Sequence, residues 1–211
     1  MDKLTLEDLA GLFEAVGRVM TEQAETLGEM DARMGDGDLG LTMKKGFTAL
    51  PEVLSGLDEP DLGKRLAKAG MKMTSIVPST MGTLMASGIM AGGKAVAGRE
   101  ALDGAGFAAY LQGFAEGIVK RGKCAPGDRT VLDAVRPAAD AAKAAAEAGA
   151  GLEAVAQAAL RGAREGVEAT KAMRPKFGKA AVFADKALGT PDQGACAGMF
   201  MVQGYRDFIC G

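Results

Sequence analysis

The sequence predicts an all-α protein whose helices form a closed antiparallel eight-helix barrel or bundle. Apolar residues recur at three- and four-residue intervals through most of the 211 residues, and no segment alternates apolar and polar residues as a half-buried strand does. Many segments are rich in alanine and joined by short connections, which favours antiparallel neighbours. The length, without an internal repeat or a low-complexity linker, predicts one domain over residues 1–211.

Boundary residues support the helices of the N-terminal half. Thr5 followed three residues later by Asp8 is typical of a helix start. Asp61 after a proline predicts another start, and Pro78 interrupts the pattern because proline disfavours helix at the preceding residue. The segment after Pro78 is rich in glycine and alanine, which indicates close approach to a neighbouring helix or ligand. The helices expected in this half are residues 4–27, 42–54, 62–73 and 81–97.

The C-terminal half continues the same periodicity. The alanine-rich stretch that follows residue 129 carries Asp140, Lys143 and Glu147 at near-helical spacing, which predicts an exposed helix face. Long irregular stretches separate the helices at residues 120–128 and 173–192. The helices expected here are residues 106–119, 129–148, 152–173 and 195–209.

Composition excludes several classes of function. A net charge of −2 gives no general attraction to nucleic acid or an anionic membrane, and two Tyr with no Trp offer few stacking platforms for single strands. The polar start and the lack of a long apolar run predict a cytoplasmic protein that is not inserted in a membrane. Three cysteines without CxxC spacing argue against a zinc site or a disulfide framework.

The chain has no histidine, which excludes a Ser-His-Asp or Cys-His nucleophile and a His-ligated zinc ion within it. Any catalysis must therefore depend on carboxylates, backbone amides, cations or a bound metal.

Residues 31–38 combine three aspartates with two glycines, Gly35 and Gly37, on either side of Asp36. On a continuous helix Asp31 and Asp36 would diverge by about 140°, but a glycine-hinged turn lets Asp31, Asp36 and Asp38 converge. Converging carboxylates repel unless a cation lies between them, and oxygen-only ligands favour Mg²⁺, with Ca²⁺ or Mn²⁺ as second choices. The alternative is an acidic turn in which Asp38 caps the next helix.

Three further loops precede helices, where free backbone amides suit phosphate groups. The first contains Ser79 and Thr80, the second a Pro-Gly turn with Asp128 as a candidate N-cap, and the third a Gly/Asp segment over residues 178–195. Ordinary helix capping is sufficient to explain the first two loops taken alone, and a generic turn explains the third about as well as phosphate binding does.

Taken together and in this order, the four loops resemble the nucleotide-binding L subunit of dihydroxyacetone kinase, which is the same unit as the C-terminal domain of single-chain dihydroxyacetone kinases. The resemblance spans nearly the whole chain, and its most specific parts are the Asp-rich loop and the Pro-Gly-Asp segment. It is carried by Asp31, Met34–Gly40, Met43, Gly46, Phe47, Pro126–Ala134, Pro137, Ala138, Gly178, Lys179 and Leu188–Ala195.

The resemblance implies an eight-helix barrel that holds ADP or ATP and two Mg²⁺ ions at one end. The family's metal-ligating aspartates fall on Asp31, Asp36 and Asp38, and Lys179 becomes the expected catalytic cation. The nucleotide contacts implied by the resemblance fall on Leu39, Gly40, Leu41, Thr42, Thr80, Met81, Gly122, Val131, Lys179, Asp192, Gln193 and Gly194.

The resemblance also implies a partner. The family's substrate-holding histidine belongs to a separate K subunit or domain, so a chain without histidine is compatible with the family. This chain would then transfer phosphate to a short ketose, dihydroxyacetone or a relative, that a K-type subunit holds. The donor would be ATP, or ADP that stays bound and is recharged by a phosphocarrier protein. A homodimer is the other assembly with a precedent in the family.

Several positions depart from the family pattern. The family usually has His where Leu39 stands, Arg where Lys179 stands and Gly-Gly-Ala-Ser-Gly where residues 78–82 stand, with His and Pro in place of Thr190 and Gln193. These changes predict a divergent member with intact metal ligands and an altered phosphate loop. Two alternatives are a non-catalytic nucleotide-sensing adaptor of the same fold and a structural helical protein with a calcium-binding turn.

Overall fold

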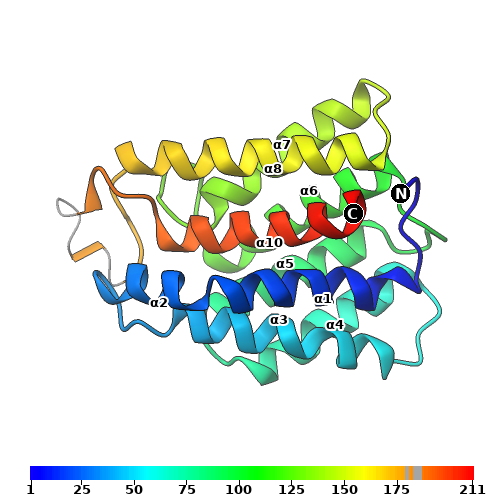
Figure 1. The fold of residues 1–211 in the computed structure, drawn as a ribbon, viewed down its shortest axis with the longest axis horizontal. Coiled ribbons are helices and arrows are strands. Elements are labelled where there is room, and N and C mark those ends of the chain that lie inside the picture. Colours follow the sequence, from blue (N-terminus) through cyan, green and yellow to red (C-terminus); the bar gives the residue numbers. More distant parts are fainter. Residues whose placement is uncertain (179–180, 183–186) are drawn as a thin grey trace.

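The computed structural model describes residues 1–178, 181–182 and 187–211, and these are almost entirely helical (Figure 1). Within them the only extended pairing is an isolated antiparallel bridge between Leu4 and Leu102. The helices are α1 (Asp8–Glu22), α2 (Ala24–Ala32), α3 (Leu39–Ser55), α4 (Leu62–Ile76), α5 (Thr80–Ala95), α6 (Gly104–Gly122), α7 (Leu132–Glu147), α8 (Leu152–Ala169), the 3₁₀ turn η1 (Thr170–Ala172) and α10 (Gln193–Cys210).

The long helices close into a ring. Helix α1 packs on α3, and each of α3, α4, α5, α6, α7 and α8 then packs on the next in order; α10 packs on both α8 and α1. Consecutive neighbours run antiparallel, as their short connections require (Figure 1). This arrangement confirms the predicted all-α antiparallel barrel, in which α1 and α2 together take the place of one helix.

The predicted helix over residues 4–27 is wrong at both of its ends. Leu4 pairs with Leu102 through two backbone hydrogen bonds of 2.8 Å, so the helix begins only at Asp8, whose carboxylate accepts hydrogen bonds from both the N–H and the hydroxyl of Thr5. The helix then breaks at Gln23, and α2 continues to Ala32. The late start arises from a contact with a distant part of the chain, which local periodicity does not record.

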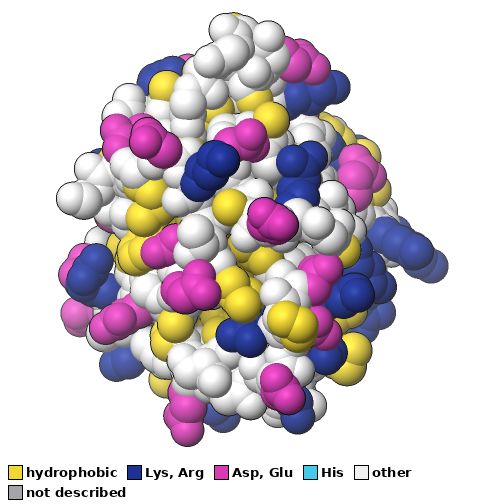
Figure 2. Space-filling model, turned by 90° about the vertical axis from the view of Figure 1, so that its right-hand side faces the viewer, with side chains coloured by type: hydrophobic (Ala, Val, Ile, Leu, Met, Phe, Trp, Pro, Cys, Tyr) yellow, Lys and Arg dark blue, Asp and Glu magenta, His cyan; other side chains and the backbone are white. Residues whose placement is uncertain are grey.

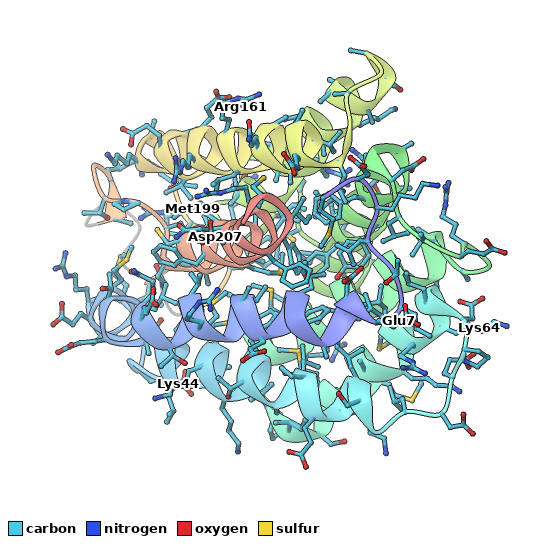
Figure 3. The ribbon with its side chains drawn as sticks, turned by 45° about the vertical axis from the view of Figure 1, so that its right-hand side comes forward. Glu7, Lys44, Lys64, Arg161, Met199 and Asp207 are labelled. Carbon is cyan, nitrogen blue, oxygen red and sulfur yellow. The ribbon has the colours of Figure 1, made fainter. Side chains whose placement is uncertain are left out.

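An aromatic cluster fills the barrel. Phe13, Phe107 and the two tyrosines are all buried, with edge-to-face contacts around Tyr205 at centroid distances of 5.7 to 6.0 Å. The hydroxyls of Tyr110 and Tyr205 meet at 3.0 Å, so each of these two buried hydroxyls has a hydrogen-bond partner. The charged side chains of Lys44 on α3 and Arg161 on α8 point outward from the barrel (Figure 3).

The up-and-down order of the helices decides where the loops lie. Both termini and the connections α3–α4, α5–α6 and α7–α8 lie at one end of the barrel, while the connections α2–α3, α4–α5, α6–α7 and α8–α10 lie at the other (Figure 1). Figure 2 shows the end with the termini, where acidic and basic side chains are interspersed. The four loops singled out in the sequence therefore share the opposite end of the molecule.

None of the helices in the described part of the chain is both long enough and apolar enough to cross a membrane.

Candidate functional site

A cavity of about 340 Å³ opens at the end of the barrel where the four loops meet. Its size is within the range usual for small-molecule sites. All four predicted loops contribute to its wall, together with Leu84 from α5. The lining residues are Asp31, Met34, Gly35, Asp36, Asp38, Leu39, Ser79, Thr80, Met81, Leu84, Arg129, Thr130, Val131, Phe177, Gly178, Asp192, Gln193 and Gly194.

Three carboxylates converge on one side of this cavity. Asp31, Asp36 and Asp38 each offer an oxygen, and these oxygens all lie within 4.8 Å of one another. Asp31, at the end of α2, is buried, and its Oδ2 accepts a 2.9 Å hydrogen bond from the Gly37 N–H. A set of carboxylate oxygens without nitrogen or sulfur donors fits a hard divalent cation such as Mg²⁺.

Contrary to the alternative interpretation, the side chain of Asp38 does not cap the following helix. Asp38 stands at the N-cap position of α3, but the side chain makes no capping hydrogen bond there. Its carboxylate instead belongs to the acidic cluster.

Glycines let the acidic loop turn this tightly. A Cβ on Gly35 would overlap the Asp31 carboxylate, 2.9 Å from its Cγ, so a side chain at this position would displace that carboxylate. Gly37 adopts φ +78°, a left-handed conformation that glycine reaches without steric cost. The composition of the loop therefore follows from the close approach of its backbone to Asp31.

Two helix N-termini face the same cavity. Ser79 caps α5 by accepting from the Gly82 N–H at 3.0 Å, and Asp192 caps α10 by accepting from the Ala195 N–H at 2.8 Å. Gln193, in the first turn of α10, donates from Nε2 to Asp31 Oδ1 at 3.5 Å. The first turns of both helices present backbone amides and partial positive charge, which suit an anion.

The loop before α7 differs from the prediction. Asp128 does not cap the helix: its carboxylate accepts from the Ala125 N–H at 2.7 Å and pairs with Lys176 at 2.5 Å. Asp133 instead accepts from the backbone N–H groups of Gly127 and Thr130. The helix therefore begins at Leu132 and not at residue 129.

Arg129 lines the pocket, although it was not among the predicted site residues. It is only 3% exposed and has φ +60°, a left-handed conformation that costs a residue with a Cβ about 1–2 kcal/mol. Its Nη2 donates to the Thr190 carbonyl at 3.1 Å, and its Nε lies 3.9 Å from Asp192 Oδ1. An arginine directly after Pro-Gly-Asp gives no local sign that its side chain will be buried.

The structure places the predicted site residues in three groups. Asp31, Asp36, Asp38, Leu39, Thr80, Met81, Val131, Asp192, Gln193 and Gly194 line the cavity. Gly40, Leu41 and Thr42 belong to the first turn of α3 but are not among the lining residues, and Leu41 is 68% exposed. Gly122 lies against Leu84 of the wall. Lys179 lies outside the described residues.

The buried carboxyl of Asp192 should make the folding stability of the protein depend on pH. Burial raises the pKa of its carboxyl to about 6, although the Ala195 N–H and the Arg129 charge act in the other direction. Because the folded-state pKa lies above the ordinary value of 3.8, the stability this group confers is complete below about pH 4 and is lost as the pH rises through 6. In Asp192→Asn this titration disappears.

We therefore expect the unfolding free energy of the wild type, minus that of Asp192→Asn, to fall by roughly 1–2 kcal/mol between pH 5 and pH 7.5. Urea denaturation of both proteins at pH 5 and pH 7.5 measures this difference in unfolding free energy. A difference that stays constant with pH would show that Asp192 titrates in its ordinary range.

The fold and this cavity define a class of protein: a closed helical barrel with clustered carboxylates and helix N-termini around one open end. The model of the DAK2 domain family matches residues 33–207 of the chain. The chain belongs to the DAK2 domain family.

The relatives include kinases and a kinase subunit. The chain is 28% identical over 187 residues to the Escherichia coli (strain K12) "PEP-dependent dihydroxyacetone kinase, ADP-binding subunit DhaL", and the match covers 89% of each chain. It is 32% identical over 189 residues to a "D-erythrulose kinase" of Mycolicibacterium smegmatis, with 89% of this chain and 33% of the relative covered. The chain thus spans nearly all of the first relative but only about a third of the second.

Solved structures agree with the fold. The native dihydroxyacetone kinase of C. freundii matches with a TM-score of 0.73 and 23% identity, over 98% of this chain and 36% of that one. The same enzyme in complex with AMP-PNP and Mg²⁺ matches with a TM-score of 0.71 and 25% identity, over 94% of this chain and 33% of that one.

Proposed function

We propose that this chain is the nucleotide-binding subunit of a phosphotransferase that acts on an alcohol group. It would hold ADP or ATP with Mg²⁺ in the cavity and transfer phosphate to a short ketose, dihydroxyacetone or a close relative. The observation that supports this most strongly is the convergence of three carboxylates beside two helix N-termini within one cavity. The family membership and the ADP-binding relative support the same proposal.

Different residues of the chain would bind the metal ion and the phosphate groups. Asp31, Asp36 and Asp38 would hold Mg²⁺, with two ions as the expected number. When bound, the metal neutralises charge on the phosphoryl groups. The amides in the first turns of α5 and α10 would bind phosphate oxygens, and Lys179 would add a positive charge. The chain has no histidine, so a histidine that holds the ketose would have to come from a partner.

The surface around the cavity supports a protein partner. Four of the six large apolar side chains that are exposed in the described chain belong to α3's first turn or to the segment between η1 and α10: Leu41, Phe177, Val182 and Leu188. Exposed apolar groups gathered beside a site are typical of an interaction surface. We propose that a ketose-binding K-type subunit docks there, and that its histidine and this chain's nucleotide meet at the interface.

The donor is ATP or a phosphocarrier protein that recharges bound ADP. The relative whose name combines PEP dependence with ADP binding supports the second route.

A non-catalytic nucleotide-sensing adaptor is the second candidate. The observation that favours it is the apolar wall that Leu39 and Met81 form, because neither side chain can donate a hydrogen bond to a phosphate. An adaptor would bind nucleotide without transferring phosphate when a ketose-binding partner is added.

Calorimetric titration of ADP and ATP into metal-stripped protein, with and without Mg²⁺, tests the proposal. We expect Mg²⁺-dependent binding in the micromolar range, and phosphate transfer to dihydroxyacetone once a K-type subunit and a donor are supplied. Binding without transfer would favour the adaptor. No binding under any metal condition would contradict both candidates.

A further inference from the structure

One buried guanidinium joins both ends of the segment that connects η1 to α10. Arg129 donates from Nη1 to the Met173 carbonyl at 3.4 Å, and from Nη2 to the carbonyl of Thr190 at 3.1 Å and to its hydroxyl at 3.3 Å. The two partners lie 44 and 61 positions further along the chain. A single side chain therefore fixes where this segment leaves the barrel wall and where it returns.

Both ends of that segment lead into the cavity wall. Phe177 and Gly178 follow Met173 and line the cavity, and Gln193 and Gly194 follow Thr190 and line it from the other side. Asp192, which caps α10, lies 3.9 Å from Arg129 Nε through its Oδ1. The guanidinium of Arg129 thus binds the residues from which two separate parts of the cavity wall begin.

The same contacts extend to the acidic cluster. The cap by Asp192 sets the first turn of α10, and from that turn Gln193 Nε2 reaches Asp31 Oδ1 at 3.5 Å. A shift of Arg129 would therefore be transmitted through Asp192 and Gln193 to the carboxylate that is buried in the acidic cluster.

Arg129 is not placed to bind a ligand through its free donor. Its Nε is buried and has no hydrogen-bond partner within the described residues, and the nearest carboxylate is Asp192. The left-handed backbone at Arg129 is one that glycine would adopt without cost, yet the chain has a long side chain there. We infer that the side chain of Arg129, and not its backbone conformation, is what the structure requires at this position.

We propose that Arg129 is a positioning residue of the nucleotide site, which holds the 173–178 wall and the first turn of α10 at the separation that a metal-bound nucleotide requires. This inference rests on the function proposed above. A different role would be purely electrostatic: the guanidinium would only neutralise the buried carboxylate of Asp192.

The double variant Arg129→Gly/Asp192→Asn separates the two roles. Glycine keeps the left-handed backbone, and asparagine keeps a cap acceptor for the Ala195 N–H while removing the buried charge. If Arg129 positions the wall, Mg²⁺·ADP should bind to the double variant at least about tenfold more weakly than to the Asp192→Asn single variant, because the ties to Met173 and Thr190 are gone. Millimolar methylguanidinium should restore part of that affinity. Arg99→Gly, in an exposed loop at the other end of the barrel, is the matched control and should bind as the wild type does.

A measurement without nucleotide keeps this inference distinct from the proposed function. Limited proteolysis with trypsin or chymotrypsin, read by mass, should cut after Lys176 or Phe177 several-fold faster in the double variant than in the Asp192→Asn single variant. If the wild type fails to bind Mg²⁺·ADP, the proposed function fails and the cleavage rates alone decide the role of Arg129.

Affinity and cleavage rates in the double variant equal to those of Asp192→Asn alone would overturn the proposal. If the double variant does not fold, Arg129→Lys takes its place: one ammonium retains the charge but does not reach both carbonyls, so positioning predicts weaker binding and faster cleavage. Neutralisation alone predicts that both stay at the wild-type level.

Discussion

Replacing Asp36 by Asn is expected to weaken Mg²⁺-dependent ADP binding at least about 100-fold, which is nearly 3 kcal/mol. The side chain is exposed, and its oxygen lies within 4.8 Å of oxygens of Asp31 and Asp38. Asparagine keeps the shape of the side chain but removes one of three charges that would hold the cation. Isothermal calorimetry of both proteins in the presence of Mg²⁺ measures the change.

The stability of the ligand-free protein should hardly change in Asp36→Asn. An exposed side chain contributes little to the core, and removing one of three clustered negative charges relieves repulsion of up to about 1 kcal/mol. Thermal unfolding without ligand should therefore stay close to the wild type, while the shift that Mg²⁺ and ADP produce should disappear.

Asp58→Asn is the matched control, because Asp58 is exposed in the α3–α4 connection at the other end of the barrel (Figure 1). It should bind ADP as the wild type does. A structural calcium turn predicts the reverse pattern for Asp36→Asn, with lower stability in calcium and no effect on nucleotide. That outcome would exclude the kinase proposal for this loop.

Replacing Gly40 by Ala is expected to destabilise the fold by about 3 kcal/mol. A Cβ at Gly40 would overlap the carbonyl oxygen of Ala24 and lie 2.7 Å from its carbonyl carbon. The obstacle is backbone at the start of α2, so it does not yield as a flexible side chain would. Alanine is favoured over glycine in a helix by up to about 1 kcal/mol, which is less than the cost of the overlap.

Thermal or urea unfolding measures this effect, and a domain of this size should lose roughly 6–12 °C in its melting temperature. Nucleotide binding should weaken as well, because α3 begins directly after the acidic loop and would have to move away from α2. Gly151→Ala is the control: its backbone has φ −70°, and a Cβ there would meet nothing within 4 Å. Its stability should stay within about 0.5 kcal/mol of the wild type. Equal stability of the two variants would show that α2 and α3 separate at little cost.

Much of the fold was predictable because each helix buries one face. That burial imposes a period of 3.6 residues on the local sequence, so the positions of the long helices could be identified without knowledge of their neighbours. Short connections then implied an up-and-down order, and that order brings alternate loops together at one end. The acidic cluster was predictable for a similar reason, since Asp31, Asp36 and Asp38 lie within eight residues and glycines allow the turn.

The errors lie where distant contacts override local preference. The first helix starts late because Leu4 pairs with Leu102, nearly a hundred residues away. The start of α7 is set by Asp133, which binds the preceding loop, and not by Asp128, although both aspartates are suitable caps by residue type. Residue type alone does not decide which backbone amides each of two nearby carboxylates will bind.

The sequence by itself determined that the chain is helical, where its glycine and aspartate loops fall and to which family it belongs, since these depend on short-range periodicity and local motifs. Only the tertiary structure decided that Arg129 joins Met173 to Thr190, that Gln193 reaches Asp31 and that Gly40 lies against Ala24. These contacts link residues up to 162 positions apart. They exist because the ring of helices closes, and closure depends on the packing of all the helices together, which no single segment of the sequence specifies.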